Sequence, residues 1–336
     1  MAKIRVAING FGRIGRITLR QLLRYPDICV VAINDLADTA TLAHLFKYDS
    51  VHGQYKGSVK VSNGFMIVKG QKIRIFSSEL PGGVDWGALA IDVVIESTGK
   101  FVDKTNALKH IEAGARKVII SAPAKAESDD IKYIVLGINE HIISPEDRII
   151  SNASCTTNCV APMIKVLDDI WGIAEGFITT VHSYTRDQNL IDAPHTDWRR
   201  GRAAAYSIIP TTTGAAKAAT KIFPHLEHKL GGAGIRVPVP DGSLTDLTCT
   251  LRKSASIKAI NAAFRKAAKG DLKGILEYTE DPIVSIDIIG NTHSAIFDAG
   301  LTAVLGDENK LVKIVAWYDN EFGYASRLAE LVRKFA

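Results

Sequence analysis

Short apolar runs alternate with segments of helical periodicity along the first half of the chain. Apolar residues over Lys3–Asn9 and Ile28–Asn34 predict strands, and helical spacing between them predicts a helix ending at about Arg24. Asp38–Phe46 has helical spacing as well. Further strands are predicted near Lys60, near Lys72, over 92–97 and over 117–121. This alternation predicts an α/β fold with a Rossmann-type, doubly wound parallel sheet.

The second half has a different pattern. After a helix that follows Ser154, apolar alternation predicts strands over 177–183, 234–239 and 244–251, then a helix over 257–269. This order predicts an α+β domain with a mainly antiparallel sheet. The stretch from Ser183 to Pro210 lacks periodicity, and unpatterned segments of that length are typically functional or lie in a subunit contact.

Composition narrows the class of protein. The chain has 336 residues, 46% of them hydrophobic and 23% charged, as expected for a globular protein of two domains. Its net charge of +5 comes without a run of like charges, so no dedicated nucleic-acid site is predicted. We find no leader peptide and no apolar run that could span a membrane. The four cysteines are too few for a disulfide framework, which favours a cytoplasmic chain.

A glycine motif follows the first predicted strand and opens a helix. Gly10 permits a tight turn, Gly12 lets backbone approach a pyrophosphate, and Gly15 permits close packing of helix on strand. Asp35 ends the second predicted strand, where a carboxylate accepts hydrogen bonds from the adenosine ribose and repels a 2′-phosphate. NAD is therefore favoured over NADP. The alternative for Asp35 is a residue at the N-terminus of the following helix.

Cys155 lies in the first turn of a predicted helix behind the N-cap residue Ser154. The free N–H groups of a helix start stabilise a thiolate, which is the nucleophilic form of cysteine. The alternative is a small buried cysteine. Cys159 lies one turn further on and is expected in the core, since no further cysteine or histidine cluster completes a metal site. We therefore predict no metal.

His182 follows a predicted strand. A single histidine in such a place is usually structural, but beside an activated cysteine it becomes the candidate base. Nucleophile and base have to meet in space and not in sequence.

Several blocks of sequence together resemble phosphorylating glyceraldehyde-3-phosphate dehydrogenases. They run in order from Ile4 to at least Tyr324, and they are INGFGRIGR, INDL, KYDSVHG, ESTGKF, SNASCTTNC, TTVHSYT, RRGRAAA, IIPTTTGAAKA, RVPVP and WYDNEFGY. The resemblance implies that Cys155 attacks the aldehyde of D-glyceraldehyde 3-phosphate and forms a hemithioacetal, while His182 takes the proton. Transfer of a hydride to NAD leaves a thioester, and inorganic phosphate releases 1,3-bisphosphoglycerate. The implied process is glycolysis or gluconeogenesis.

The same resemblance implies the binding residues. The substrate phosphate would lie near Thr185, Arg200 and Arg236, and the attacking phosphate would be held by Ser154, Thr156, Thr213 and Gly214. Arginine forks and hydroxyl groups suit phosphate. Without the family, the favoured interpretations are a solvated basic turn for 199–202 and a helix cap for 211–214. The implied cofactor residues are Gly10, Gly12, Arg13, Ile14, Gly15, Asp35, Thr98, Gly99, Ser121 and Asn320.

The resemblance also implies the organisation of the protein. It predicts an NAD-binding domain over 1–154 together with a C-terminal helix over 320–336, a catalytic domain over 155–319, and a homotetramer. Glu79, near the expected adenine position, and Arg186, after Thr185, depart from the family pattern. Erythrose-4-phosphate dehydrogenase is the alternative activity, and the intact TTTGAAKA stretch disfavours it. A binding protein without catalysis is a second alternative, although no basic and aromatic patch supports it.

Overall fold

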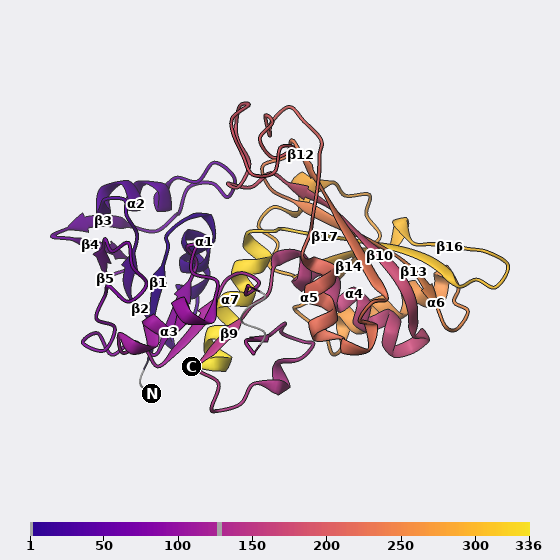
Figure 1. Cartoon of the computed structure of the whole chain (residues 1–336), viewed down its shortest axis with the longest axis horizontal. Coiled ribbons are helices and arrows are strands. Elements are labelled where there is room, and N and C mark those ends of the chain that lie inside the picture. Colours follow the sequence, from indigo (N-terminus) through magenta and orange to yellow (C-terminus); the bar gives the residue numbers. More distant parts are fainter. Residues whose placement is uncertain (1–2, 126–129) are drawn as a thin grey trace. The chain divides into compact units, whose positions relative to one another are not determined.

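The computed structural model describes residues 3–125 and 130–336, which fall into two compact units (Figure 1). The first unit comprises the described residues of Met1–Ile134, His141–Ala153 and Ala325–Ala336, and the second comprises Val135–Glu140 and Ser154–Tyr324. The domain boundaries inferred from the sequence stay a prediction.

The first unit contains a nine-stranded sheet in the order β3-β4-β5-β2-β1-β6-β7-β9-β8. The elements are β1 (Ile4–Asn9), α1 (Arg13–Leu22), β2 (Ile28–Asn34), α2 (Thr39–Lys47), β3 (Val59–Ser62), β4 (Phe65–Val68), β5 (Gln71–Phe76), β6 (Val93–Glu96), α3 (Lys104–Glu112), β7 (Lys117–Ile120), β8 (Lys132–Tyr133) and β9 (Ile149–Ser151). From β5 to β8 the strands are parallel, and β3 and β4 add an antiparallel edge.

This sheet confirms the predicted doubly wound architecture. The chain moves from β1 to β2 in one direction along the sheet and from β6 to β7 in the other. Right-handed crossovers then place α1 and α3 on opposite faces. The strand order reverses between β1 and β6, and ligands of such sheets bind outside the carboxyl ends of the strands at this point.

The second unit contains an eight-stranded sheet in the order β11-β12-β10-β13-β17-β15-β14, with β16 paired to β17. The elements are α4 (Cys155–Trp171), β10 (Ile173–Ser183), β11 (Ile209–Thr211), α5 (Ala215–Ile222), β12 (Leu230–Val237), β13 (Ser243–Leu251), α6 (Ile257–Lys269), β14 (Leu276–Thr279), β15 (Ala295–Asp298), β16 (Ala303–Leu305) and β17 (Leu311–Tyr318). Helix α7 (Phe322–Phe335) follows β17, and its residues from Ala325 onward belong to the first unit. The described residues also form short 3-10 helices at Glu140–Ile142, Pro224–Leu226, Ser285–Ile288 and Ala299–Leu301.

Most pairs in the second sheet are antiparallel, as the α+β prediction requires. Only β10 with β12 and β14 with β15 are parallel among the described pairs. Helices α4, α5 and α6 cover one face of the sheet (Figure 1). Residues of β13 alternate between buried and half-buried, and the buried set, including Leu247 and Cys249, joins the core beneath α4. Phe264 of α6 stacks on Phe297 of β15 with 3.9 Å between ring centroids.

Some element boundaries differ from the prediction. Strand β12 begins at Leu230 and not at Gly234, since its glycines make room for a neighbour: a Cβ on Gly231 would lie 2.5 Å from the ring of Phe177. Strand β10 begins at Ile173, four residues before the predicted start at Phe177. Helix α1 ends at Leu22 instead of Arg24.

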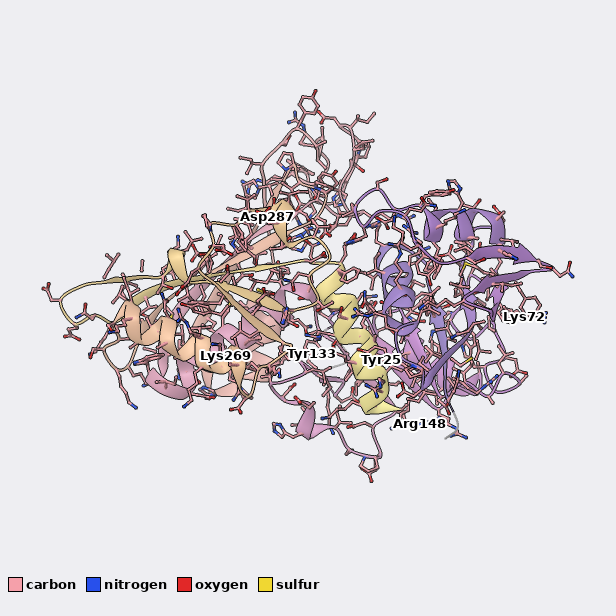
Figure 2. The ribbon with its side chains drawn as sticks, turned by 180° about the vertical axis from the view of Figure 1, so that it is seen from behind. Tyr25, Lys72, Tyr133, Arg148, Lys269 and Asp287 are labelled. Carbon is pink, nitrogen blue, oxygen red and sulfur yellow. The ribbon has the colours of Figure 1, made fainter. Side chains whose placement is uncertain are left out.

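The C-terminal helix also begins later than predicted. The carboxylate of Asp319 accepts hydrogen bonds from the backbone N–H groups of Glu321 and Phe322 at 2.9 and 2.6 Å, so α7 starts at Phe322 and not at Asn320. In the first unit, Arg333 of α7 lies over the ring of Tyr25 at 4.9 Å and bonds Asp27 at 2.8 Å. Figure 2 labels Tyr25 beside this helix.

The segment between β10 and β11 forms no regular helix or strand, as predicted (Figure 1). It exposes several large apolar side chains, namely Leu190, Ile191, Trp198, Tyr206 and Ile208. Within the described parts of the chain, no helix combines the length and hydrophobicity needed to cross a bilayer.

The stacked pair of rings yields a stability prediction. Phe264→Ala removes a fully buried ring that packs on Phe297, and it should lower the free energy of unfolding by about 3–5 kcal/mol. Ile257→Ala changes an exposed position of the same helix and should cost less than about 1 kcal/mol. Denaturant unfolding of both variants measures the difference, and equal losses would contradict the assigned core.

Candidate functional site

The turn after β1 has the geometry of a dinucleotide-binding loop. Gly10 has φ of +91°, and a Cβ there would lie 2.6 Å from the backbone nitrogen of Thr98. A Cβ on Gly15 would lie 2.2 Å from the carbonyl oxygen of Gly10, so both positions require glycine. At Gly12 an added Cβ would meet only open space, and no side chain caps the start of α1. The free N–H groups beside this open space fit a pyrophosphate.

Asp35 belongs to this turn and not to the following helix. Its carboxylate accepts hydrogen bonds from the backbone N–H of Phe11 at 2.7 Å and of Ala37 at 3.1 Å. Asp38 is the N-cap of α2 and accepts from Ala40 and Thr41. The alternative that placed Asp35 at a helix N-terminus is therefore wrong, and the carboxylate lies beside the glycine turn.

Arg13 and Ile14 form the first turn of α1. Arg13 makes a 2.6 Å ion pair with Asp49 of the KYDSVHG block. Burial opposes ionisation of Asp49, but the His52 and Val51 N–H groups and the Arg13 guanidinium outweigh it and lower the pKa of this carboxyl to about 2. Arg13 is therefore held toward the 49–53 segment, while Ile14 is half-buried.

A second loop meets the glycine turn after β6. Ser97 donates through its hydroxyl to the carbonyl of Gly10 at 2.7 Å, and Thr98 and Gly99 follow at once. Gly99 has φ of +72° and open space where a Cβ would be. Ser121 follows β7, with its N–H bonded to the carbonyl of Glu96 at 2.9 Å. These cofactor candidates thus share the carboxyl edge of the first sheet.

Cys155 is the first residue of α4, as predicted. Ser154 is the N-cap, and its hydroxyl accepts from the backbone N–H of Thr157 at 3.0 Å. Ala153, just before it, is fully buried with φ of +53°, a conformation that costs a residue with a side chain about 1–3 kcal/mol. Such strain is commonly retained beside functional side chains. The residue Cys159 lies in the core, as expected.

His182 lies next to the cysteine although 27 residues separate the two. The distance from Cys155 Sγ to His182 Nε2 is 3.5 Å. His182 Nδ1 lies 2.7 Å from the carbonyl oxygen of Ser183, which can only accept, so Nδ1 carries the proton. Nε2 is then an acceptor that faces the sulfur. Arg236 Nη1 also approaches Nδ1, at 3.1 Å, but this contact joins two donors and is not a hydrogen bond in this tautomer.

Burial shifts the pKa of both partners. It is the main cause that raises the pKa of the Cys155 thiol above its ordinary value, while the charge of Arg236 opposes the rise. Burial, together with Arg236, lowers the pKa of His182 from 6.5 to about 4. Stabilisation of a thiolate by the helix start stays a prediction.

Arg236 and Arg200 converge on one carboxylate. Arg236 donates to the hydroxyl of Thr185 at 2.7 Å, and Thr185 donates to Asp187. Arg200 bonds Asp187 at 2.5 Å and the hydroxyl of Thr211 at 2.9 Å. The alternative of a freely solvated basic turn therefore fails for Arg200. Sequence reasoning missed Asp187, whose carboxylate shares these arginines with any incoming anion.

Thr156 and Tyr318 lie beside the pair of Cys155 and His182. The hydroxyls of Thr156 and Tyr318 lie 2.9 Å apart, and the ring of Tyr318 meets that of His182 edge-on at 6.0 Å between centroids. Tyr318 is buried and ends β17. Sequence reasoning missed it as well, although it stands in the WYDNEFGY block.

The remaining predicted residues lie just before α5 and after β17. The hydroxyl of Thr213 accepts from the N–H of Ala215 at 3.2 Å, and the N-cap of α5 is Gly214, so no N-cap side chain caps this helix. Asn320 Oδ1 accepts from the hydroxyls of Ser183 and Ser243 at 3.0 and 2.6 Å. Among the residues that the structure describes, none accepts from Asn320 Nδ2.

The fold and these groups define a dinucleotide-dependent dehydrogenase with a paired cysteine and histidine. Residues 4–104 match the family described as "Glyceraldehyde 3-phosphate dehydrogenase, NAD binding domain". Residues 154–320 match "Glyceraldehyde 3-phosphate dehydrogenase, C-terminal domain". The chain therefore belongs to the glyceraldehyde-3-phosphate dehydrogenase family, and its cofactor is NAD.

Curated relatives cover nearly the whole chain. Glyceraldehyde-3-phosphate dehydrogenase 2 of Streptomyces avermitilis is 54% identical over 330 residues, which are 98% of this chain and 97% of the relative. Glyceraldehyde-3-phosphate dehydrogenase of Streptomyces coelicolor is 56% identical over 331 residues, again 98% and 97%. The enzyme of that name from Geobacillus stearothermophilus is 52% identical over 334 residues, 99% and 98% of the two chains.

The raised pKa of the Cys155 thiol predicts how alkylation depends on pH. A raised thiol pKa means that the thiolate fraction keeps growing as the pH rises toward and beyond 9, so the rate with iodoacetamide should climb throughout pH 6–9. His182→Asn should slow the reaction below that range, where the imidazole takes the proton, and change it little at high pH. Cys159→Ala is the matched control. A plateau already near pH 6 would instead indicate a thiolate–imidazolium pair.

Proposed function

We propose that this chain oxidises D-glyceraldehyde 3-phosphate to 1,3-bisphosphoglycerate with NAD and inorganic phosphate, in glycolysis or gluconeogenesis. The observation that carries the proposal is the 3.5 Å approach of Cys155 Sγ to His182 Nε2, with Nδ1 tied to a carbonyl. A nucleophile beside an oriented base is the arrangement that covalent acyl chemistry requires.

In the first step the aldehyde carbon bonds to sulfur. His182 Nε2 takes the proton of the Cys155 thiol as the sulfur attacks, and it passes this proton to the carbonyl oxygen, giving a hemithioacetal. The N–H of Cys155 has no partner within α4, because it belongs to the first turn, and it stabilises the developing oxyanion. The pKa of His182, about 4, keeps the ring neutral and ready to accept at physiological pH.

In the second step the hemithioacetal carbon is oxidised. Bound NAD supplies the hydride acceptor. His182 accepts the hydroxyl proton that the hemithioacetal loses, and a thioester remains on Cys155. The nearby charge of Arg236 disfavours a persistent imidazolium, so this proton is readily returned. His182 gives it to the departing sulfur when phosphate oxygen attacks the acyl carbon, and the acyl phosphate leaves.

The phosphate of the substrate and the attacking inorganic phosphate would be bound by two different sets of residues in the second unit. We assign the substrate phosphate to Thr185, Arg200 and Arg236, whose forks and hydroxyl already converge on a carboxylate. The attacking phosphate is assigned to Ser154, Thr156, Thr213 and Gly214, where the starts of α4 and α5 favour negative charge.

The cofactor candidates fall into two groups, the loops at the edge of the first sheet and Asn320 after β17. The open space at Gly12 and the uncapped start of α1 suit a pyrophosphate, and Asp35 suits the adenosine ribose. The Nδ2 group of Asn320, fixed by two serine hydroxyls on Oδ1, suits the carboxamide of nicotinamide. The full proposed set is Gly10, Gly12, Arg13, Ile14, Gly15, Asp35, Thr98, Gly99, Ser121 and Asn320.

We also infer a cytoplasmic homotetramer. Trp198 and Tyr206 expose 89% and 92% of their surface in the segment between β10 and β11, and neighbouring exposed apolar residues extend this patch. Contiguous exposed apolar side chains are typical of subunit contacts. All four cysteines are unpaired, which agrees with a reducing compartment.

Steady-state kinetics test the proposed reaction. With glyceraldehyde 3-phosphate and NAD, formation of NADH should continue only while inorganic phosphate is present, since phosphate discharges the thioester. Without phosphate, a burst of about one NADH per active site should be followed by slow turnover. Cys155→Ser should lower kcat by roughly 10³-fold or more, and His182→Asn by about 10²–10⁴-fold.

Two results would contradict this function. Oxidation of erythrose 4-phosphate that is faster and independent of phosphate would favour the alternative dehydrogenase. Undiminished turnover by Cys155→Ser would rule out the covalent route. Cys159→Ala, a change in the buried neighbour on α4, serves as the control and should retain activity.

A further inference from the structure

A buried carboxylate lies beneath the loops of the proposed cofactor site. Glu96 ends β6 and is 1% exposed. Its Oε2 accepts from Asn9 Nδ2 at 2.5 Å and from His110 Nε2 at 3.1 Å. Its Oε1 accepts from the backbone N–H of Thr98 at 2.8 Å and from the Thr98 hydroxyl. Four donors thus surround one carboxylate, which is the number of hydrogen bonds that a carboxylate accepts.

The tautomer of His110 is fixed from its other side. Trp86 Nε1 can only donate, and it lies 3.1 Å from His110 Nδ1, so Nδ1 is an acceptor and the ring proton is on Nε2. That proton points at Glu96. His110 and Trp86 are both fully buried, so solvent does not replace either bond.

The chain of bonds continues across the sheet. Asn9 Oδ1 accepts from Asn34 Nδ2 at 2.7 Å. Asn34 in turn accepts from the N–H of Ser78 at 2.8 Å and donates to its carbonyl at 3.0 Å. One buried network therefore joins the ends of β1, β2 and β6 and the segment after β5.

The loops attached to this network are those of the proposed dinucleotide site. Thr98, which Glu96 holds by two bonds, forms the surface against which Gly10 packs, because a Cβ on Gly10 would lie 2.6 Å from the Thr98 nitrogen. The Thr98 hydroxyl also accepts from the N–H of Lys100 at 3.1 Å, which defines the turn containing Gly99. A shift of Glu96 would move both loops together.

We propose that Glu96, oriented by the Trp86–His110 relay, is a positioning residue that sets the spacing between the glycine turn and the Thr98–Gly99 turn for NAD. This inference rests on the cofactor site proposed above. Glu96 does not contact the cofactor in this account. It acts through Thr98 and Asn9, and the fixed histidine tautomer makes it a required acceptor.

The proton pattern makes glutamine a poor substitute. Glutamine fills the same volume, but its amide presents two N–H donors where the network already supplies donors. In either orientation of the amide, its N–H₂ group faces other donors, those of Thr98 or those of Asn9 and His110. Two buried donors then face each other without an acceptor. A defect of this kind changes hydrogen bonding without opening a cavity.

Glu96→Gln should weaken NAD binding about tenfold, measured by calorimetry on the otherwise intact enzyme. The KM for NAD should rise by a similar factor, while the KM for glyceraldehyde 3-phosphate stays within about twofold, since that site lies in the second unit. Without NAD, amide hydrogen exchange should be faster over residues 10–13 and 97–100. Glu112→Gln, at an exposed position of α3, is the matched control and should change none of these.

A second substitution tests the relay itself. Trp86→Phe removes the indole donor and frees His110 to carry its proton on Nδ1, so that Nε2 can accept from the amide of a glutamine at position 96. The double variant Trp86→Phe with Glu96→Gln should therefore bind NAD about threefold more tightly than Glu96→Gln alone. A merely structural role predicts the reverse, because each change damages the same buried region. If the losses of NAD affinity in the two single variants add in the double variant, or if the double variant binds still more weakly, the proposed relay is wrong.

Asp35→Asn separates this inference from the cofactor site on which it rests. If Asp35→Asn weakens NAD binding and a folded Glu96→Gln does not, the positioning role is wrong and the cofactor site stands. If neither weakens it, the cofactor site itself is wrong. Should Glu96→Gln fail to fold by circular dichroism, His110→Gln replaces it, and unchanged NAD affinity and exchange in that variant would equally contradict the inference.

Discussion

The contact between Cys155 Sγ and His182 Nε2 is the interaction on which the proposed chemistry depends. It requires that the side chains of the first residue of α4 and of His182, near the end of β10, approach within 3.5 Å. The N-cap Ser154 fixes where the helix starts, and the carbonyl of Ser183 fixes the ring of His182. Tyr318 of β17 contacts the ring of His182 and the hydroxyl of Thr156, the residue after Cys155, so the order of strands in the second sheet contributes to the geometry of the pair.

Burial shifts the proton affinities of this pair. It raises the pKa of the thiol and lowers that of the imidazole, and both shifts favour a proton on sulfur. The positive charge of Arg236 lowers both pKa values. It opposes burial at Cys155, where it favours the thiolate, and acts with burial at His182, where it disfavours the imidazolium. The base that results is neutral, oriented and able to return its proton, as acyl transfer requires.

Local sequence signals were enough to predict the doubly wound sheet, the glycine turn, the start of α4 and the position of Asp35 at the end of the second strand. Each of these depends on neighbouring residues in the chain. The glycine-rich start of β12 was missed because its glycines accommodate Phe177, a residue of another strand. Asp187, Tyr318 and Glu96 were missed for a related reason: their partners are set by tertiary packing, and a single carboxylate or tyrosine has no local signature. The upward shift in the pKa of Cys155 depends on burial, which the sequence alone does not reveal.

Mass spectrometry of the acylated enzyme tests the central claim most directly. The protein is mixed with NAD and glyceraldehyde 3-phosphate in the absence of inorganic phosphate, quenched in acid and digested with trypsin. Cys155 and Cys159 lie between Arg148 and Lys165 and share one peptide, so fragmentation has to locate the modification. A phosphoglyceroyl group on Cys155 that disappears when phosphate is added is the predicted result. An active enzyme that carries no acyl group, or carries it on another residue, would contradict the account.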